Sequence, residues 1–206
     1  MRTETVGVTE TLIESAKKEF LEHGFQNANL RRISSESGVS TGSIYTHFGD
    51  KAGLFSAVVK PAADGLMELY LESITAARES GDPAEATSQG NEGTELVLKY
   101  IYENFDVFKL IFCHSAGTEY ERYFDELAEI EEKYYREFVK QFSRRENMVS
   151  DFFIHVICRT GWSYIYEVVS HDLSYDEAQI FMKSIREFCF AGWGKVLGQN
   201  YEDLGL

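Results

Sequence analysis

The stretch LRRISSESGVSTGSIYTHFGDK, residues 30–51, decides the fold of this sequence. Apolar residues recur at helical spacing in two short segments, 30–37 and 41–48, and Gly38 and Val39 lie between them. Glycine permits a sharp reversal of the chain, and the valine can fill the angle between two helices that meet there. Two short helices joined by such a turn are typical of a helix-turn-helix, which places its second helix in the major groove of DNA.

The segment 41–48 has the composition expected of a helix that approaches DNA closely. Ser40 is a favoured N-cap residue, Ile44 and Phe48 face inward, and mainly small or polar side chains are left outside. Eight residues make a helix about 12 Å long, which matches the roughly 12 Å width of the major groove. We therefore expect this helix to enter the groove end-on.

Two kinds of DNA contact are expected from this region. Unpaired backbone N–H groups at a helix start favour phosphate, as at the start that Asn29 caps, where Arg31 adds positive charge. Such contacts set the position of a protein on DNA rather than its sequence preference. Sequence reading is expected from Thr41, Ser43 and Thr46, through hydroxyl hydrogen bonds or methyl contacts to thymine.

Tyr45 and His47 lie on the same predicted helix and are expected to reach backbone phosphates. It is equally compatible with the sequence that each of these two side chains lies on the surface without contacting a base. Arg32 is expected to be solvated rather than bound to phosphate. The full set of predicted DNA-binding residues is Asn29, Arg31, Thr41, Gly42, Ser43, Tyr45, Thr46, His47 and Lys51.

The remaining sequence also favours helices, so the predicted fold class is all-α. The chain of 206 residues contains only two prolines, and residues with high helix propensity are frequent. The first predicted helix covers 9–25, with Gly24 in a left-handed position at its C-terminal end. Asp50 is expected to cap the helix that begins at 51, and Pro61 to end or kink it. Further helices are expected at about 62–80, 94–104, 105–114, 119–143, 149–171 and 174–197, with a turn at 81–83.

The charge of the chain is unevenly distributed. The formal net charge is −14, which on its own argues against nucleic acid as a partner. Residues 1–60 carry seven basic and seven acidic side chains, so the whole excess lies in the later part of the sequence. Because salt screens charges over about 8 Å, a distant acidic body would not cancel local phosphate contacts. It would discourage loose, non-specific binding.

Several classes of protein are disfavoured by the sequence. The acidic, polar N-terminal segment is not a signal peptide, and no window reaches the roughly 18 apolar residues of a membrane span. The three cysteines form no CxxC pair and no set with metal-ligand spacing, so reduced thiols and a cytoplasmic protein without metal or cofactor are expected. The sequence contains no P-loop, no GxGxxG motif and no nucleophile elbow, so no enzyme is expected.

One set of residues within about 9–58 also carries a family resemblance. Its members are Leu12, Ile13, Ala16, Phe20, Gly24, Phe25, Ile33, Gly38, Val39, Ser40, Gly42, Ile44, Tyr45, His47, Phe48, Lys51 and Leu54. In this order they closely resemble the DNA-binding domain of the TetR family of transcriptional regulators. Ser34 and Ser37 depart from the family pattern, which usually has alanine there, and this bears on the stability of the domain more than on its function.

The resemblance implies an all-helical homodimer. A helix-turn-helix DNA-binding domain is expected at 1–55, and an effector-binding and dimerisation domain at 56–206. The helices at 149–171 and 174–197 of each subunit are expected to pair into a four-helix interface. The implied function is that of a regulator, usually a repressor, that binds a palindromic operator in double-stranded DNA and leaves it when a small ligand occupies the body. Activation stays open.

The resemblance also implies a small-molecule site between the middle helices of the body. Those helices carry aromatic residues with a few hydroxyl groups, which suits a hydrophobic or aromatic ligand, although plain core packing explains each of them too. A cation could also stack there, with Glu103 or Glu119 nearby. The predicted effector-binding residues are Tyr100, Phe105, Phe108, Phe112, His114, Tyr120, Tyr123 and Phe124.

An alternative function without a small-molecule effector is compatible with the same sequence. The segment 119–137 is strongly acidic and could bind a protein partner, so that the chain would act as a DNA-bound scaffold. Such an acidic helix face is more often simply solvated. A collapsed body without a cavity would favour the scaffold over the ligand sensor.

Overall fold

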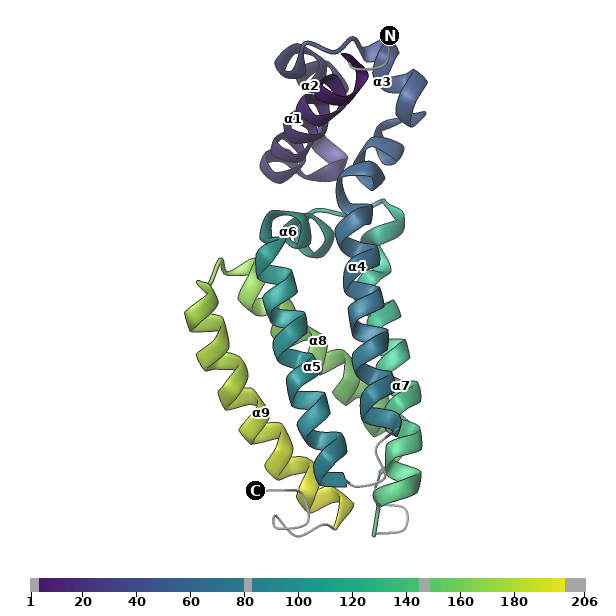
Figure 1. Ribbon diagram of the computed structural model, residues 1–206, viewed down its shortest axis with the longest axis vertical. Coiled ribbons are helices and arrows are strands. Elements are labelled where there is room, and N and C mark those ends of the chain that lie inside the picture. The colour runs from purple at the N-terminus through teal and green to yellow at the C-terminus, as the bar shows by residue number, and fades with distance from the viewer. Residues whose placement is uncertain (1–3, 80–82, 145–148, 199–206) are drawn as a thin grey trace. The chain divides into compact units, whose positions relative to one another are not determined.

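The computed structural model describes residues 4–79, 83–144 and 149–198 (Figure 1). All regular secondary structure among the described residues is helical, and none of it is a strand, which confirms the predicted all-α class. The helices are α1 (Glu4–Asn27), α2 (Leu30–Ser37), α3 (Thr41–Phe48), α4 (Lys51–Glu79), α5 (Pro83–Glu103), α6 (Phe105–Cys113), the 3-10 helix η1 (Glu119–Arg122), α7 (Tyr123–Phe142), α8 (Asp151–Ser170) and α9 (Tyr175–Leu197).

The chain packs into two compact units. The first unit contains the residues up to 65 together with 104–123, and the second contains 66–103 together with 124 onward. The helix α6 therefore packs with the N-terminal helices, although it follows them by some fifty residues. The expected division into functional domains at residues 55 and 56 remains a prediction, because packing alone does not assign function.

The first unit has a core built on aromatic rings. Phe20 of α1 and Phe55 of α4 are fully buried, with ring centroids 5.0 Å apart in an edge-to-face arrangement. Ile33 of α2 and Ile44 of α3 are also fully buried, so each short helix contributes one inward anchor. Val39 is 7% exposed between these two helices, as the sequence predicts. Burial of these side chains supplies the stability that two eight-residue helices lack by themselves.

Packing of α6 on α1 is fixed by a backbone hydrogen bond. The N–H of Phe25 donates to the carbonyl oxygen of His114 at 3.0 Å, directly after α6 ends. Gly24 has φ +69°, and a Cβ at that position would lie 3.6 Å from Nδ1 of His114. Gly24 has non-helical backbone angles that kink α1, and a short helical piece follows the kink up to Asn27. The predicted positive φ at Gly24 is therefore confirmed, and the predicted end near this residue coincides with the kink.

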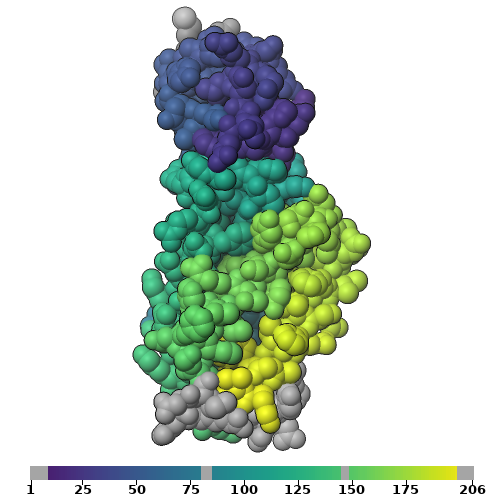
Figure 2. Space-filling view, turned by 180° about the vertical axis from the view of Figure 1, so that it is seen from behind, coloured from purple at the N-terminus to yellow at the C-terminus, as the bar shows by residue number. Residues whose placement is uncertain are grey.

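The second unit is a bundle of helices. The helix α5 packs beside α9, where Arg186 pairs with Glu95 at 2.7 Å. Figure 2 shows α8 and α9, in green and yellow, side by side on one face, and the rings of Phe153 and Trp193 join them at 5.6 Å. Hydrophobic side chains from several helices fill the centre of the bundle. The fully or nearly fully buried ones include Leu66, Leu127, Ile154, Ile165, Val168 and Val169.

Three predicted helix boundaries are wrong, and the first is the start of α1, which lies at Glu4 rather than at 9. Pro61 does not end α4, and the buried Ala62 and Ala63 that follow hold the helix in place despite the missing hydrogen bond. The alternative expectation of a kink at Pro61 stays a prediction. The helix α5 begins at Pro83 rather than at about 94 and contains both Gly90 and Gly93. Glycine disfavours a helix by only about 1 kcal/mol, which packing can offset.

The other boundaries fit the predictions closely. The helices α2, α3, α6, α8 and α9 lie where they are expected, to within two residues. The acidic segment from 119 divides into η1 and α7. Of the predicted turn at 81–83, residues 81 and 82 lie outside the described residues. Within the described ranges, every helix is too short or too polar to span a lipid bilayer.

Candidate functional site

Side-chain caps define where α2, α3 and α4 begin. The Asn29 side chain accepts a hydrogen bond from the N–H of Arg31 at 2.8 Å, and Ser40 Oγ accepts one from the N–H of Ser43 at 3.1 Å. Asp50 accepts one from the N–H of Gly53 at 2.8 Å. All three predicted caps are thus confirmed. Each cap fixes the direction in which the other free N–H groups of that helix start can bind an anion.

The outer face of α3 is polar and accessible. Ile44 is fully buried and Phe48 half-buried, whereas Tyr45 is 55% exposed and His47 is exposed beside it. The exposed Thr46 donates a hydrogen bond from its hydroxyl to the carbonyl oxygen of Gly42 at 2.9 Å, so this hydroxyl is already bonded within the helix. The exposed predicted DNA-binding residues are Asn29, Arg31, Gly42, Tyr45, Thr46 and His47, and the half-buried ones are Thr41, Ser43 and Lys51.

Lys51 has a structural role in the first unit. Its ammonium group donates to the carbonyl oxygens of Gln26 and Ala28 at 3.0 and 3.1 Å and lies 4.7 Å from the centroid of the Phe25 ring. These contacts tie the start of α4 to the end of α1. Arg32 is engaged as well, because its Nε donates to Glu19 at 2.9 Å. Neither cation is therefore as accessible to phosphate as the exposed Arg31.

The eight predicted effector-binding residues are buried or half-buried. Six of them belong to the first unit, where the Tyr123 hydroxyl donates to the carbonyl oxygen of Ala63 at 2.6 Å and the Tyr120 hydroxyl shares a hydrogen bond of 3.0 Å with Ser56. In the second unit, Phe124 packs on the ring of Trp162. The six in the first unit are Phe105, Phe108, Phe112, His114, Tyr120 and Tyr123, and the two in the second are Tyr100 and Phe124.

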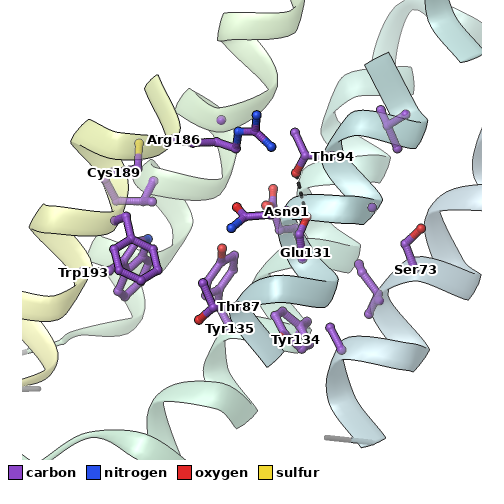
Figure 3. Close-up of a pocket in the computed structure, with 18 of the residues that line it drawn as sticks. Ser73, Thr87, Asn91, Thr94, Glu131, Tyr134, Tyr135, Arg186, Cys189 and Trp193 are labelled. Atoms are coloured by element: carbon purple, nitrogen blue, oxygen red, sulfur yellow. Dashed lines mark hydrogen bonds between the residues drawn. The ribbon is translucent and has the colours of Figure 1, made fainter. Parts of the chain in front are cut away.

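A cavity of about 280 Å³ lies inside the second unit, between α4, α5, α7, α8 and α9 (Figure 3). None of the eight predicted effector-binding residues lines it, and their role in binding an effector stays a prediction. Eight aromatic residues contribute to its walls, and both tryptophans of the chain are among them. The aromatic lining residues are Tyr70, Tyr134, Tyr135, Phe138, Trp162, Tyr164, Phe190 and Trp193.

Glu131 of α7 is the acidic residue of this cavity. Burial raises the pKa of its carboxyl group to about 8, and a hydrogen bond with Trp162 offsets this only in part. Gly161 of α8 leaves space beside the carboxyl group, since a Cβ there would lie 3.8 Å from Oε2 of Glu131. The cation in the lining, Arg186, is paired with Glu95.

The sequence contains a signal that marks Glu131 as unusual, although the predicted effector-binding residues do not include it. Leu127, Tyr134 and Phe138 mark the inward stripe of α7, and position 131 falls on the same stripe at i, i+4 spacing. An acid on an apolar stripe is unusual and indicates a special environment. The remaining lining residues come from five helices, and only packing brings these together.

Comparison with known proteins identifies the N-terminal region. Residues 12–58 match the model of the bacterial regulatory proteins of the tetR family. The transcriptional repressor AcnR of Corynebacterium glutamicum is 39% identical over 62 residues, which cover 30% of this chain and 33% of AcnR. The regulator AcrR of Shigella flexneri is 35% identical over 72 residues, covering 35% and 33%. The chain thus matches about a third of the length of each of these relatives.

Solved structures resemble the whole fold. A TetR-family regulator from Syntrophomonas wolfei superposes with a TM-score of 0.64 at 15% identity, over 95% of this chain and 97% of that one. FadR of Bacillus subtilis, solved with stearoyl-CoA, superposes with a TM-score of 0.59 at 14% identity, over 86% and 95%. At such low identity, the likeness shows the fold and nothing about the ligand.

Proposed function

The chain belongs to the TetR family of bacterial transcriptional regulators, which bind DNA and are not enzymes, and we propose that it is a ligand-controlled repressor. In this proposal a homodimer binds a palindromic operator and is released when a small molecule occupies the cavity of the second unit. The observation that carries the proposal is the outer face of α3, which is capped by Ser40, anchored by the buried Ile44 and exposed at Tyr45.

Operator contacts would be divided between phosphate and bases. The capped starts of α2 and α3, together with the exposed Arg31, suit phosphate. Thr46 would offer its methyl group to a thymine, because its hydroxyl is already bonded within the helix. Lys51 would act indirectly, by holding the end of α1 against the start of α4.

Exposed apolar side chains on α8 and α9 support a second copy of the chain as the partner. Phe152 is 75% exposed, Ile180 is 70% exposed and Phe188 is 73% exposed. Large apolar residues gathered on neighbouring helices indicate an interface, and a two-fold axis would bury the same patch of both subunits. In such a dimer, the two α3 helices must lie about 34–36 Å apart, or a multiple of this distance, to enter successive major grooves.

Ligand control would work through α4 and α6. The single helix α4 begins directly after α3 and carries the cavity residues Tyr70 and Ser73 near its other end. The helix α6 is bonded to α1 through Phe25 and His114. A ligand that displaces the cavity end of α4 would change the separation of the α3 helices, so that both could no longer fit the operator.

Selection of bound duplexes from a random DNA pool, with the purified protein at moderate salt, tests the operator proposal. An inverted repeat is expected, and the absence of any enriched sequence would overturn the proposal. Phe188→Glu should convert a dimer to a monomer in sedimentation and weaken binding to the full repeat, whereas Gln141→Glu on the exposed face of α7 adds the same charge and should do neither. A Phe188→Glu protein that stays dimeric would argue against the α8 and α9 interface.

A further inference from the structure

The cavity combines one acid with many aromatic rings. Tyr135 of α7 and Trp193 of α9 stack with their planes 2° apart and their centroids 5.0 Å apart, and Tyr70 of α4 meets Trp162 of α8 edge-to-face at 5.0 Å. Glu131 lines the same cavity as these rings, and Figure 3 shows it together with Tyr135 and Trp193. The faces of aromatic rings carry negative electrostatic potential, so a positive charge is stabilised both by the rings and by the carboxylate.

The ionisable groups that face Glu131 leave its charge uncompensated. Burial raises the pKa of Tyr70 on α4, of Tyr135 on α7, of Cys158 on α8 and of Cys189 on α9, so these groups stay neutral near pH 7. The lining residues of α5 that face the cavity, such as Asn91 and Thr94, are uncharged.

Arg186 does not neutralise Glu131. It is the one basic residue among the described residues that line the cavity, and its guanidinium group bonds to Glu95 at 2.7 Å. The cause of the raised pKa of Glu131 is burial, with a hydrogen bond from Trp162 acting against it. Ionisation of a desolvated carboxyl group without a cationic partner is unfavourable, and a ligand cation would reduce this penalty.

We infer that the effector of this cavity is a compact hydrophobic organic cation, such as an aryl quaternary ammonium compound, held by Glu131 and the aromatic rings. This inference rests on the proposed ligand control and names the class of ligand. The volume of about 280 Å³ lies just below the roughly 300–1,000 Å³ of small-molecule pockets, which favours a small ligand over a long acyl chain. A carboxylate or phosphate ligand would be repelled by the ionised form of Glu131 and would gain no charge attraction from the protonated form.

Binding of such a cation should release a proton. In the empty cavity the carboxyl group of Glu131 is largely protonated at pH 7, because burial raises its pKa to about 8. A bound cation favours the ionised form, so its affinity should rise with pH until the carboxyl group is ionised without the ligand as well. A neutral ligand that accepts a hydrogen bond from the protonated acid would show the opposite trend.

Tryptophan fluorescence gives a direct test, because both tryptophans of the chain line the cavity. The probes are benzyltrimethylammonium, its uncharged isostere neopentylbenzene and the anion phenylmethanesulfonate. The quaternary ammonium group cannot titrate, so any pH dependence of its binding reports on the protein. We expect the cation to bind more tightly than both other probes, with an affinity that increases between pH 6 and pH 8.

The variant Glu131→Gln keeps the size of the side chain and removes its charge. It should bind the cation on the order of tenfold less tightly, lose the pH dependence and leave the binding of neopentylbenzene unchanged. Glu126→Gln changes the charge by the same amount at an exposed position of α7 and should behave like the wild type. Equal affinity of the cation for wild type and Glu131→Gln would overturn the inference, as would tighter binding of the neutral or anionic probe.

The pH dependence of the wild type decides the question if Glu131→Gln does not fold. An affinity for the cation that is flat or falls between pH 6 and pH 8 would then overturn the inference. Operator binding by the ligand-free wild type is measured separately. If the selected operator is bound but the cation is not, this inference fails while the proposed DNA-binding function stands.

Discussion

The carboxylate of Glu19 on α1 accepts a hydrogen bond from the backbone N–H of Asn29 at 2.7 Å and another from Nε of Arg32 at 2.9 Å. Glu19 is only 5% exposed, and it joins the middle of α1 to the start of α2. Burial by itself would raise the pKa of this carboxyl group, but the hydrogen bonds from Arg32 and Asn29 outweigh it and lower the net pKa. The orientation of the helix-turn-helix therefore depends on a charge in α1.

Replacement of Glu19 by alanine should destabilise the first unit by about 1–3 kcal/mol, because the N–H of Asn29 loses its partner. Since the folded-state pKa is lowered, the contribution of Glu19 is present above its unfolded pKa and is lost as pH falls through the folded value. Urea unfolding at pH 7 and at acidic pH measures both effects. Glu22→Ala, on the exposed side of α1, should stay near the wild type. Equal stability of the two variants at pH 7 would contradict this role.

Tyr45→Ala and Lys51→Ala should weaken operator binding for different reasons. Tyr45 is 55% exposed, so its loss should leave the melting temperature unchanged and reduce affinity alone. Lys51 bonds two carbonyl oxygens and lies over a ring, so its loss should destabilise the first unit by about 1–2 kcal/mol and lower affinity as a consequence.

Thermal unfolding and operator titrations over a range of salt concentrations separate these two effects. Lys51 contacts DNA directly if Lys51→Ala instead unfolds like the wild type and lowers the slope of log affinity against log salt concentration by about the amount of one phosphate contact.

Gly93 and Gly90 of α5 form a matched pair for testing how closely α4 and α5 pack. A Cβ on Gly93 would lie 2.8 Å from Cβ of Ser73 on α4, whereas a Cβ on Gly90 would meet nothing within 4 Å. Gly93→Ala should therefore destabilise the second unit by about 1–3 kcal/mol through overpacking. Gly90→Ala should stabilise it by about 0.5–1 kcal/mol through helix propensity. Urea unfolding of the two variants checks the sign of each change, and a Gly93→Ala protein as stable as Gly90→Ala would show that the helices can separate at little cost.

The contrast between the two units explains what the sequence could predict. Asn29, Ser40 and Asp50 each cap the helix directly behind them, so the boundaries of the helix-turn-helix depend on residues a few positions apart. Local rules therefore locate α2 and α3 to the residue. Pro61 shows the limit of such rules, because packing of the following alanines keeps α4 helical against the preference of proline.

The cavity depends on contacts that no local rule describes. Tyr70 and Trp162 lie more than ninety residues apart in the chain and touch only because α4 and α8 pack together. The aromatic residues of α6 look like pocket residues by composition, yet Phe108 is fully buried. Glu131 is the exception, since its position on the inward stripe of α7 is visible in the sequence.

The ionisation of Glu131 should be measurable through stability even without a ligand. Its folded-state pKa of about 8 lies above the ordinary value of 4.5, so the folded protein keeps a proton that the unfolded chain releases between these two values. The contribution of Glu131 to the free energy of unfolding is therefore fully present below pH 4.5. It decreases as pH rises towards 8, by at most about 1.4 kcal/mol per pH unit. Glu131→Gln should remove this slope and exceed the wild type in stability at pH 8.5, whereas Glu126→Gln should keep the slope. Urea unfolding followed by circular dichroism at pH 5.5, 7 and 8.5 makes the comparison. Parallel profiles for wild type and Glu131→Gln would mean that water reaches the carboxylate and that the cavity does not desolvate it.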